Sequence, residues 1–147
     1  MDLTILLGDS AQVSPDNKVH ALGLGWTATR TPLPPHAVII LFDIPWNETN
    51  HVFVAKVRLV DADGNPVHQL TPMGEQPIEV EAQFEAGRPP GLPPGTSLTM
   101  PLAFNLPPGT PVRPGRYEWR VEVDGEERAN WRRGFLVVEQ QASPRVA

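Results

Sequence analysis

The stretch Asp61-Ala-Asp-Gly-Asn is the part of the sequence that most resembles a metal-binding loop. Carboxylate and amide oxygens suit Ca²⁺, but an EF-hand loop requires glycine at its sixth position and glutamate at its twelfth. Here glycine is fourth and Pro72 is twelfth. A plain hairpin turn is therefore the favoured interpretation, and a looser calcium site that uses this turn and nearby glutamates is the alternative.

The histidines do not show a recognisable metal motif. No two of them have the i, i+4 spacing that places two ligands on one face of a helix, and the chain has no cysteine. Independent, scattered histidines are expected, although two on adjacent strands could meet in space. The residues concerned are His20, His36, His51 and His68.

Nucleophile and acid–base patterns are equally weak, so we expect no enzyme activity, no cofactor and no metal. Glu79, Glu81 and Glu85 alternate along one predicted strand, which indicates a solvated acidic face and not two carboxylates across a glycosidase cleft. No glycine pattern for phosphates or dinucleotides is present. The serines lie in no nucleophile-elbow context; they are Ser10, Ser14, Ser97 and Ser143.

Tryptophan and proline give the better candidates for an interaction site. Of the tryptophans Trp26, Trp46, Trp119 and Trp131, Trp46 lies in a loop rich in proline and asparagine and is the best candidate for exposure. An exposed tryptophan suits a sugar platform or a protein interface. The alternative is a plug over the end of the fold.

Residues 87–96 are predicted to form an ordered arm that contacts another chain. The prolines of this segment restrict it before binding, so docking would lose less conformational entropy. Leu92 offers an apolar anchor and Arg88 a charged contact. The alternative is an intramolecular crossover between sheets, in which Leu92 covers its own domain. Trp46, Arg88 and Leu92 are thus the candidate interaction residues.

The elements that must position these residues are strands. Tyr117, Trp119, Val121 and Val123 alternate with polar residues, which indicates a half-buried strand with Trp119 in the core. Residues 135–138 are predicted as the returning strand of the same hairpin. Further strands are expected over residues 4–7, 18–29, 37–44, 51–61, 67–70, 78–85 and 98–106, and residues 37–44 should be buried on both faces.

The composition supports an all-β fold, because 18 prolines and 12 glycines among 147 residues exclude long helices. An antiparallel two-sheet sandwich is the expected architecture, with one domain over residues 1–139 and a flexible tail over 140–147. A net charge of −5 disfavours nucleic-acid binding. No signal peptide or membrane span is evident, so we expect a cytoplasmic protein or one in a particle assembled there.

Two resemblances add to this interpretation. The Pro-Gly-x-Tyr-x-Trp strand and its returning strand resemble the last hairpin of immunoglobulin-like domains, with Tyr117 placed like a tyrosine corner. The segments LGLGW, GRPPGLPPGT and PGRYEWR resemble a family of small uncharacterised bacterial proteins. This second resemblance implies one β-sandwich and no catalytic residue.

We therefore expect a noncatalytic structural or interaction subunit that has a protein partner or forms a homo-oligomer, for instance within a larger assembly such as a phage particle. Sandwiches leave strand edges that can pair with other chains. The alternative is a small-ligand or carbohydrate-binding module that uses Trp46 and its neighbouring loops.

Overall fold

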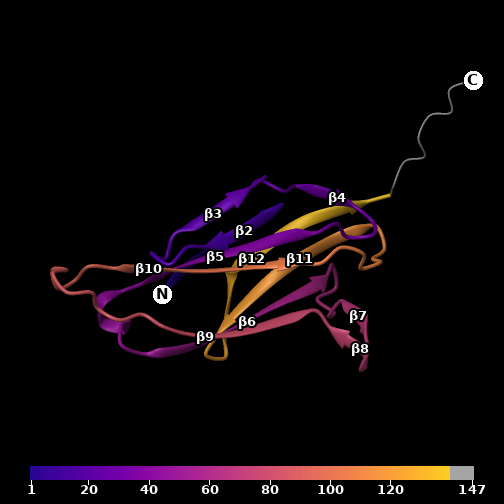
Figure 1. Cartoon of the computed structure of the whole chain (residues 1–147). Coiled ribbons are helices and arrows are strands. Elements are labelled where there is room, and N and C mark those ends of the chain that lie inside the picture. Colours follow the sequence, from indigo (N-terminus) through magenta and orange to yellow (C-terminus); the bar gives the residue numbers. More distant parts are fainter. Residues whose placement is uncertain (140–147) are drawn as a thin grey trace, which may run out of the picture.

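The most deeply buried strand of the computed structural model, which describes residues 1–139, is β5 (His36–Ile44). Its nearly continuous apolar sequence suits a strand that is covered on both faces. β1 (Asp2–Gly8) and β10 (Leu98–Leu106) flank it, both antiparallel, in a three-stranded sheet (Figure 1). The prediction of a strand over residues 37–44 is confirmed; its burial on both faces holds over residues 37–40, whereas Leu41 is half-buried and Asp43 is exposed on the outer face.

The stretch expected to be one strand over residues 18–29 is divided into β3 (Val19–Leu22) and β4 (Ala28–Arg30). The expectation was wrong because Gly23 and Gly25 adopt positive φ angles of 67° and 102°, which end the extended chain. A Cβ on Gly23 would lie 2.1 Å from Oδ2 of Asp9, so glycine permits a close approach there. A strand that the sequence did not indicate, β2 (Ser10–Val13), pairs with β3 in a two-stranded sheet.

The second large sheet has five strands in the order β4-β12-β11-β6-β9. All neighbours in it are antiparallel except β4, which runs parallel to β12. The expectation of a wholly antiparallel fold is wrong at this edge, because β4 enters from the β2–β3 hairpin and no turn joins it to β12. The bounds of the other strands are β6 (Val52–Asp61), β9 (Glu79–Glu85), β11 (Gly115–Val123) and β12 (Glu126–Val138).

A second small hairpin, formed by β7 (His68–Thr71) and β8 (Gly74–Pro77), leads from β6 to β9. It projects from the body of the molecule at the lower right of Figure 1. Leu70 and Met73 near its tip are 85% and 88% exposed. β8 was not expected, since its sequence Gly-Glu-Gln-Pro has no apolar alternation.

The core lies between the two large sheets and is centred on β11. Trp119 is completely buried, and Val121 and Val123 beside it are 1% and 4% exposed, so the predicted inward face of this strand is confirmed. The hydroxyl of Tyr117 donates to the carbonyl oxygen of Arg113 at 2.7 Å, which ties the start of β11 to the preceding loop.

The fold of residues 1–139 is thus all-β, with several sheets, one of them curled into a half-barrel. The helical content of these residues is one 3₁₀ turn, Trp46–Glu48, which agrees with the exclusion of long helices. No helix among them is long and apolar enough to cross a membrane. The predicted tail, residues 140–147, lies outside the described residues.

Candidate functional site

The two large sheets meet differently on their two sides. On one side, β1 lies close to β12, and Leu3, Ile5 and Leu7 of β1 are only 8%, 5% and 2% exposed. On the other side, the outer strands are β9 and β10, which show no comparable approach. One side of the core is therefore closed and the other is open.

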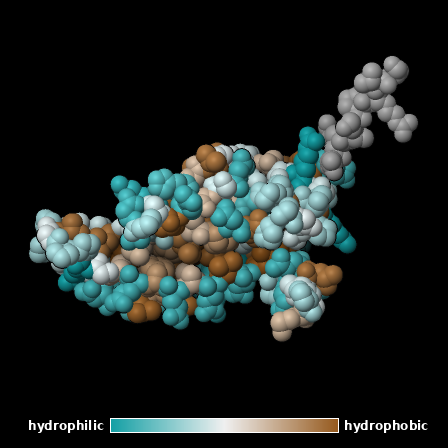
Figure 2. All heavy atoms as spheres, viewed as in Figure 1, coloured by the Kyte–Doolittle hydropathy of each residue, from teal (hydrophilic) through white to brown (hydrophobic). Residues whose placement is uncertain are grey.

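Half-buried apolar side chains line the open side, and we call this surface the open seam. Its members on β9 are Val80, Ala82 and Phe84, and those on β10 are Leu98, Met100, Leu102 and Phe104. In Figure 2 apolar surface is visible between hydrophilic rims, in the region where Figure 1 draws β9 and β10. The side chains of the seam are less exposed than Leu70 or Met73, but they form a continuous apolar surface along β9 and β10.

Phe84 forms the floor of the open seam. Its ring centroid lies 4.6 Å from that of Phe42 and 5.4 Å from that of Phe53, and both of these residues are buried in the core. Phe42 lies opposite Met100 in the β5–β10 pairing, so β9 and β10 contact the same core residue. The seam is therefore a continuation of the core that the fold leaves uncovered.

The structure brings together two of the three candidate interaction residues. Nε of Arg88 donates to Oγ1 of Thr49 at 2.6 Å, and Nη2 donates to the carbonyl oxygen of Trp46 at 2.7 Å. The same guanidinium lies 4.1 Å from the centre of the Trp46 ring, a cation–π contact. Trp46 is half-buried, and Arg88 covers one face of its ring. Together these contacts fasten the start of the arm to the 3₁₀ turn.

The arm itself joins β9 of one large sheet to β10 of the other, so the crossing between sheets that was the alternative is present, whereas contact of the arm with another chain stays a prediction. Thr96 closes a turn in it, since its hydroxyl donates to the carbonyl oxygen of Pro93 at 2.7 Å. Leu92 is half-buried. A cavity of about 410 Å³ lies between the base of the arm and the start of β10; Glu85, Arg88, Leu98, Thr99 and Met100 are among its lining residues.

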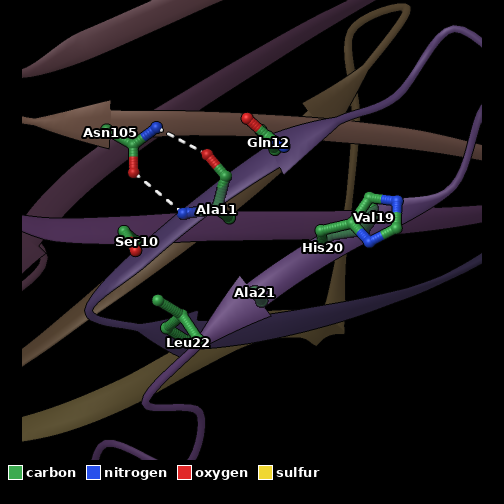
Figure 3. Close-up of a pocket in the computed structure, with 8 residues that line it drawn as sticks. All are labelled: Ser10, Ala11, Gln12, Val19, His20, Ala21, Leu22 and Asn105. Atoms are coloured by element: carbon green, nitrogen blue, oxygen red, sulfur yellow. Dashed lines mark hydrogen bonds between the residues drawn. The ribbon is translucent and has the colours of Figure 1, made fainter.

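A larger hollow of about 780 Å³ lies over the β2–β3 hairpin, with Gln12, His20 and Leu22 among its lining residues (Figure 3). Asn105 of β10 spans from the sheet to this hairpin. Its side chain accepts from the backbone N–H of Ala11 at 3.0 Å and donates to the carbonyl oxygen of Ala11 at 2.8 Å. These two bonds replace those of a neighbouring strand, so β2 covers the end of β10 and the exposed edge is confined to its beginning.

The turn after β6 has a structural explanation. Oδ1 of Asp61 accepts hydrogen bonds from the backbone N–H groups of Asp63, at 3.0 Å, and Asn65, at 2.9 Å. Such bonds stabilise tight turns, so the hairpin-turn interpretation is confirmed. Within residues 1–139, no group of three or more His, Cys, Asp or Glu side chains could hold a metal ion.

Two of the histidines have specific surroundings. His36 is buried and stacks on Trp26 at 4.8 Å between ring centroids, and burial lowers its pKa. His51 is exposed, and its Nε2 lies 2.9 Å from Oδ2 of Asp124. The other carboxylate oxygen of Asp124 accepts the backbone N–H of Val54 at 2.9 Å, and this bond is the main reason that the pKa of Asp124 is lowered.

Sequence reasoning placed the seam residues on the correct strand faces but did not identify the seam. The alternation in residues 78–85 and 98–106 shows which side chains point inward, and these strands are confirmed. It carries no information on which strands lie at a sheet edge. Pro101 was the available signal, because proline within a sheet favours an edge strand, and β10 is indeed an edge strand.

Comparison with known proteins gives one result. No curated protein matches the chain. A family model described as "Family of unknown function (DUF6941)" matches residues 3–132, which agrees with the expected resemblance to an uncharacterised family. The chain therefore belongs to this family, DUF6941.

Proposed function

We propose that this protein is a noncatalytic interaction subunit that binds a protein partner through the open seam. The observation that carries the proposal is the contrast between the two sides of the fold. Side chains of β1 are almost completely buried where β12 closes the core, whereas Phe84 and Met100 are only half-buried where β9 and β10 leave it open. A partner that covered the seam would bury this apolar surface at a gain of about 25 cal/mol per Å².

The hydrogen bond and the cation–π contact between Arg88 and Trp46 support the same function. They hold the arm in place beside the seam, so that a partner would meet a pre-ordered surface and lose less entropy on binding. A carbohydrate module built on Trp46 has weaker support, because Arg88 already covers one face of the ring that a sugar would stack on.

The finer fold assignment is part of this proposal. We assign the chain to the immunoglobulin-like sandwiches, which act as interaction modules in many proteins through loops and edges. The bond from Tyr117 to the carbonyl of Arg113, four residues upstream, supports the assignment, since a tyrosine corner makes a bond of this kind. We expect the subunit to function inside the cell, within a larger assembly such as a phage particle.

A position-specific crosslinking experiment tests the proposed function. A photoreactive benzoylphenylalanine is placed at Thr99, beside the seam, and separately at Arg116, an exposed control position on β11. We expect an adduct of defined mass only from Thr99. The partner that it identifies should bind the purified protein in calorimetry with a negative heat-capacity change, the mark of apolar burial.

The substitution Met100→Asp provides the decisive comparison. It places a charge in the seam, and we expect it to abolish partner binding while the far-ultraviolet circular dichroism remains that of an all-β protein. Equal adducts from Thr99 and Arg116, or binding that Met100→Asp leaves unchanged, would show that the seam is not the binding surface. Sedimentation of the purified protein distinguishes a second copy from a different partner.

A further inference from the structure

The β9 strand leaves half of its backbone hydrogen-bonding groups without a strand partner within residues 1–139, because it pairs only with β6. The backbone N–H of Leu59 donates to the carbonyl of Ile78 at 3.1 Å, and the β6–β9 register continues from this pair. Hydrogen-bonded pairs alternate along an antiparallel ladder. The odd-numbered residues therefore turn their backbone groups outward: Glu79, Glu81, Gln83 and Glu85.

The side chains of β9 define what could pair there. Glu79, Glu81 and Glu85 are exposed on the outer face of the sheet, and no ion pair among residues 1–139 neutralises them. Arg58, which lies opposite Glu79 in the register, is paired with Glu127 instead. The alternate residues of β9 face the open seam. A strand added to this edge would thus meet carboxylates on one face and apolar surface on the other.

A second copy of the chain fits this edge poorly. Antiparallel pairing of two β9 strands about Ala82 would place Glu79 of each copy opposite Glu85 of the other, and like charges directly opposite are destabilising. The β10 edge is also unfavourable, because Pro101 lacks a backbone donor. The charge pattern disfavours self-pairing and at the same time favours a basic strand.

We propose that β9 accepts, by strand addition, an extended segment of a partner protein that carries lysine or arginine at alternate positions and apolar residues between them. This inference rests on the proposed function and specifies the chemistry of the partner. The basic side chains lie over Glu79, Glu81 and Glu85, and the apolar ones extend over Phe84 and the seam. The arm and the β7–β8 hairpin flank the seven residues of β9, so the paired segment has about the same length (Figure 1).

A synthetic peptide tests this geometry without knowledge of the natural partner. The probe is a fluorescein-labelled nonapeptide, Thr-Lys-Val-Lys-Val-Lys-Val-Lys-Thr, and the controls replace every lysine by glutamate or the central valine by proline. We expect saturable binding of the probe alone in fluorescence anisotropy. Amide hydrogen exchange then slows at Glu79, Glu81, Gln83 and Glu85, whereas Val80, Ala82 and Phe84 change little because their amides already bond to β6.

Substitutions at Gln83 separate strand addition from simple charge attraction. Gln83→Pro removes an outward donor, which an edge strand tolerates, and Gln83→Thr is the matched control that keeps it. We expect Gln83→Pro to weaken peptide binding at least about tenfold, since it removes a backbone hydrogen bond and obstructs the added strand. Gln83→Thr should leave binding unchanged. Thermal unfolding checks that both variants fold. If Gln83→Pro does not fold, the amide exchange pattern of the unaltered protein with the peptide decides between strand addition and charge attraction.

Charge removal completes the test. The triple variant Glu79→Gln, Glu81→Gln, Glu85→Gln should weaken binding and reduce its salt dependence, whereas Asp63→Asn with Glu139→Gln, which removes carboxylates elsewhere, should not. Strand addition would be overturned if the peptide did not bind. It would also be overturned if the peptide bound without slowing amide exchange on β9 and if Gln83→Pro left this binding intact. The proposed function would survive either result if crosslinking at Thr99 still identified a partner, so the two failures are distinguishable.

Discussion

Truncation of two aromatic residues, Trp119→Ala and Phe84→Ala, separates the closed core from the open seam. Trp119 is completely buried, and its ring centroid lies 5.9 Å from that of the buried His36, so its removal leaves a cavity enclosed by protein. Loss of a large aromatic side chain from such a site costs about 3–5 kcal/mol. Phe84 packs against Phe42 and Phe53 but keeps part of its surface open to solvent.

The expected cost for Phe84 follows from its partial burial. Aromatic side chains bury about 150–250 Å² when covered. Most of that area is covered in Phe84, and two thirds of it at about 25 cal/mol per Å² gives about 2.5–4 kcal/mol for Phe84→Ala, with no added cavity cost because water fills the space. Trp119→Ala should therefore destabilise the domain by about 1 kcal/mol more than Phe84→Ala.

Urea denaturation followed by tryptophan fluorescence and circular dichroism measures both costs, with equal slopes required for the comparison. Glu118→Ala is the control on the opposite face of β11; Glu118 is half-buried and pairs with Arg120 at 2.6 Å and with Arg132 at 3.7 Å, and its loss should cost no more than about 1 kcal/mol. If Phe84→Ala were as costly as Trp119→Ala, Phe84 would be enclosed and the seam would not be open. An unchanged midpoint for Trp119→Ala would place Trp119 outside the core.

Three further predictions concern single residues. Leu92→Asp should reduce partner binding or oligomer mass without a change in thermal unfolding, whereas early melting with unchanged mass would show that Leu92 packs only on its own domain. Burial lowers the pKa of His36 below its ordinary 6.5, so the unfolded chain binds the proton more readily; urea midpoints should fall as the pH drops below 6.5, and His36→Gln should remove this slope. The hydrogen bond from the Val54 N–H and then the contact with His51 lower the pKa of Asp124 below its ordinary 3.8. The stability that the charge of Asp124 contributes above pH 3.8 should therefore be lost as the pH falls through the lowered pKa, and Asp124→Asn should show no such loss. If urea midpoints fell identically at low pH in both proteins, the assignment to Asp124 would be contradicted.

Local alternation was sufficient to predict most strands but not their pairing. The alternation around Trp119 and the apolar run in β5 each reflect burial of the strand itself; the first prediction is confirmed, and the second is confirmed except at Leu41 and Asp43 on the outer face. The parallel pairing of β4 with β12 depends on a connection of many residues, so nothing in the sequence of Ala28–Arg30 indicates it. The split of residues 18–29 was visible in Gly23 and Gly25, but two positive φ angles were needed to show a change of direction.

The candidate residues show the same division between local and non-local information. Proline spacing identified the arm, and the loop around Trp46 was correctly placed outside the strands. The contact between Trp46 and Arg88 joins residues 42 apart in sequence, so only the fold reveals it. Asp124 was expected only as part of an Asp-Gly turn, since its bond to Val54 spans 70 residues and cannot be inferred from the local sequence.

The exposed glutamates of β9 bear on how this sheet edge avoids aggregation. An exposed sheet edge beside an uncovered apolar seam can pair with the same edge of another copy and so lead to aggregation. Most proteins reduce this hazard with charges or proline at the edge, and here β9 has glutamates and β10 has Pro101. Proline acts against every partner strand, whereas like charges act only against acidic ones. The glutamates therefore disfavour self-pairing, and in the proposed function they favour a basic segment at β9, so specificity at this edge would follow from the sign of the charge.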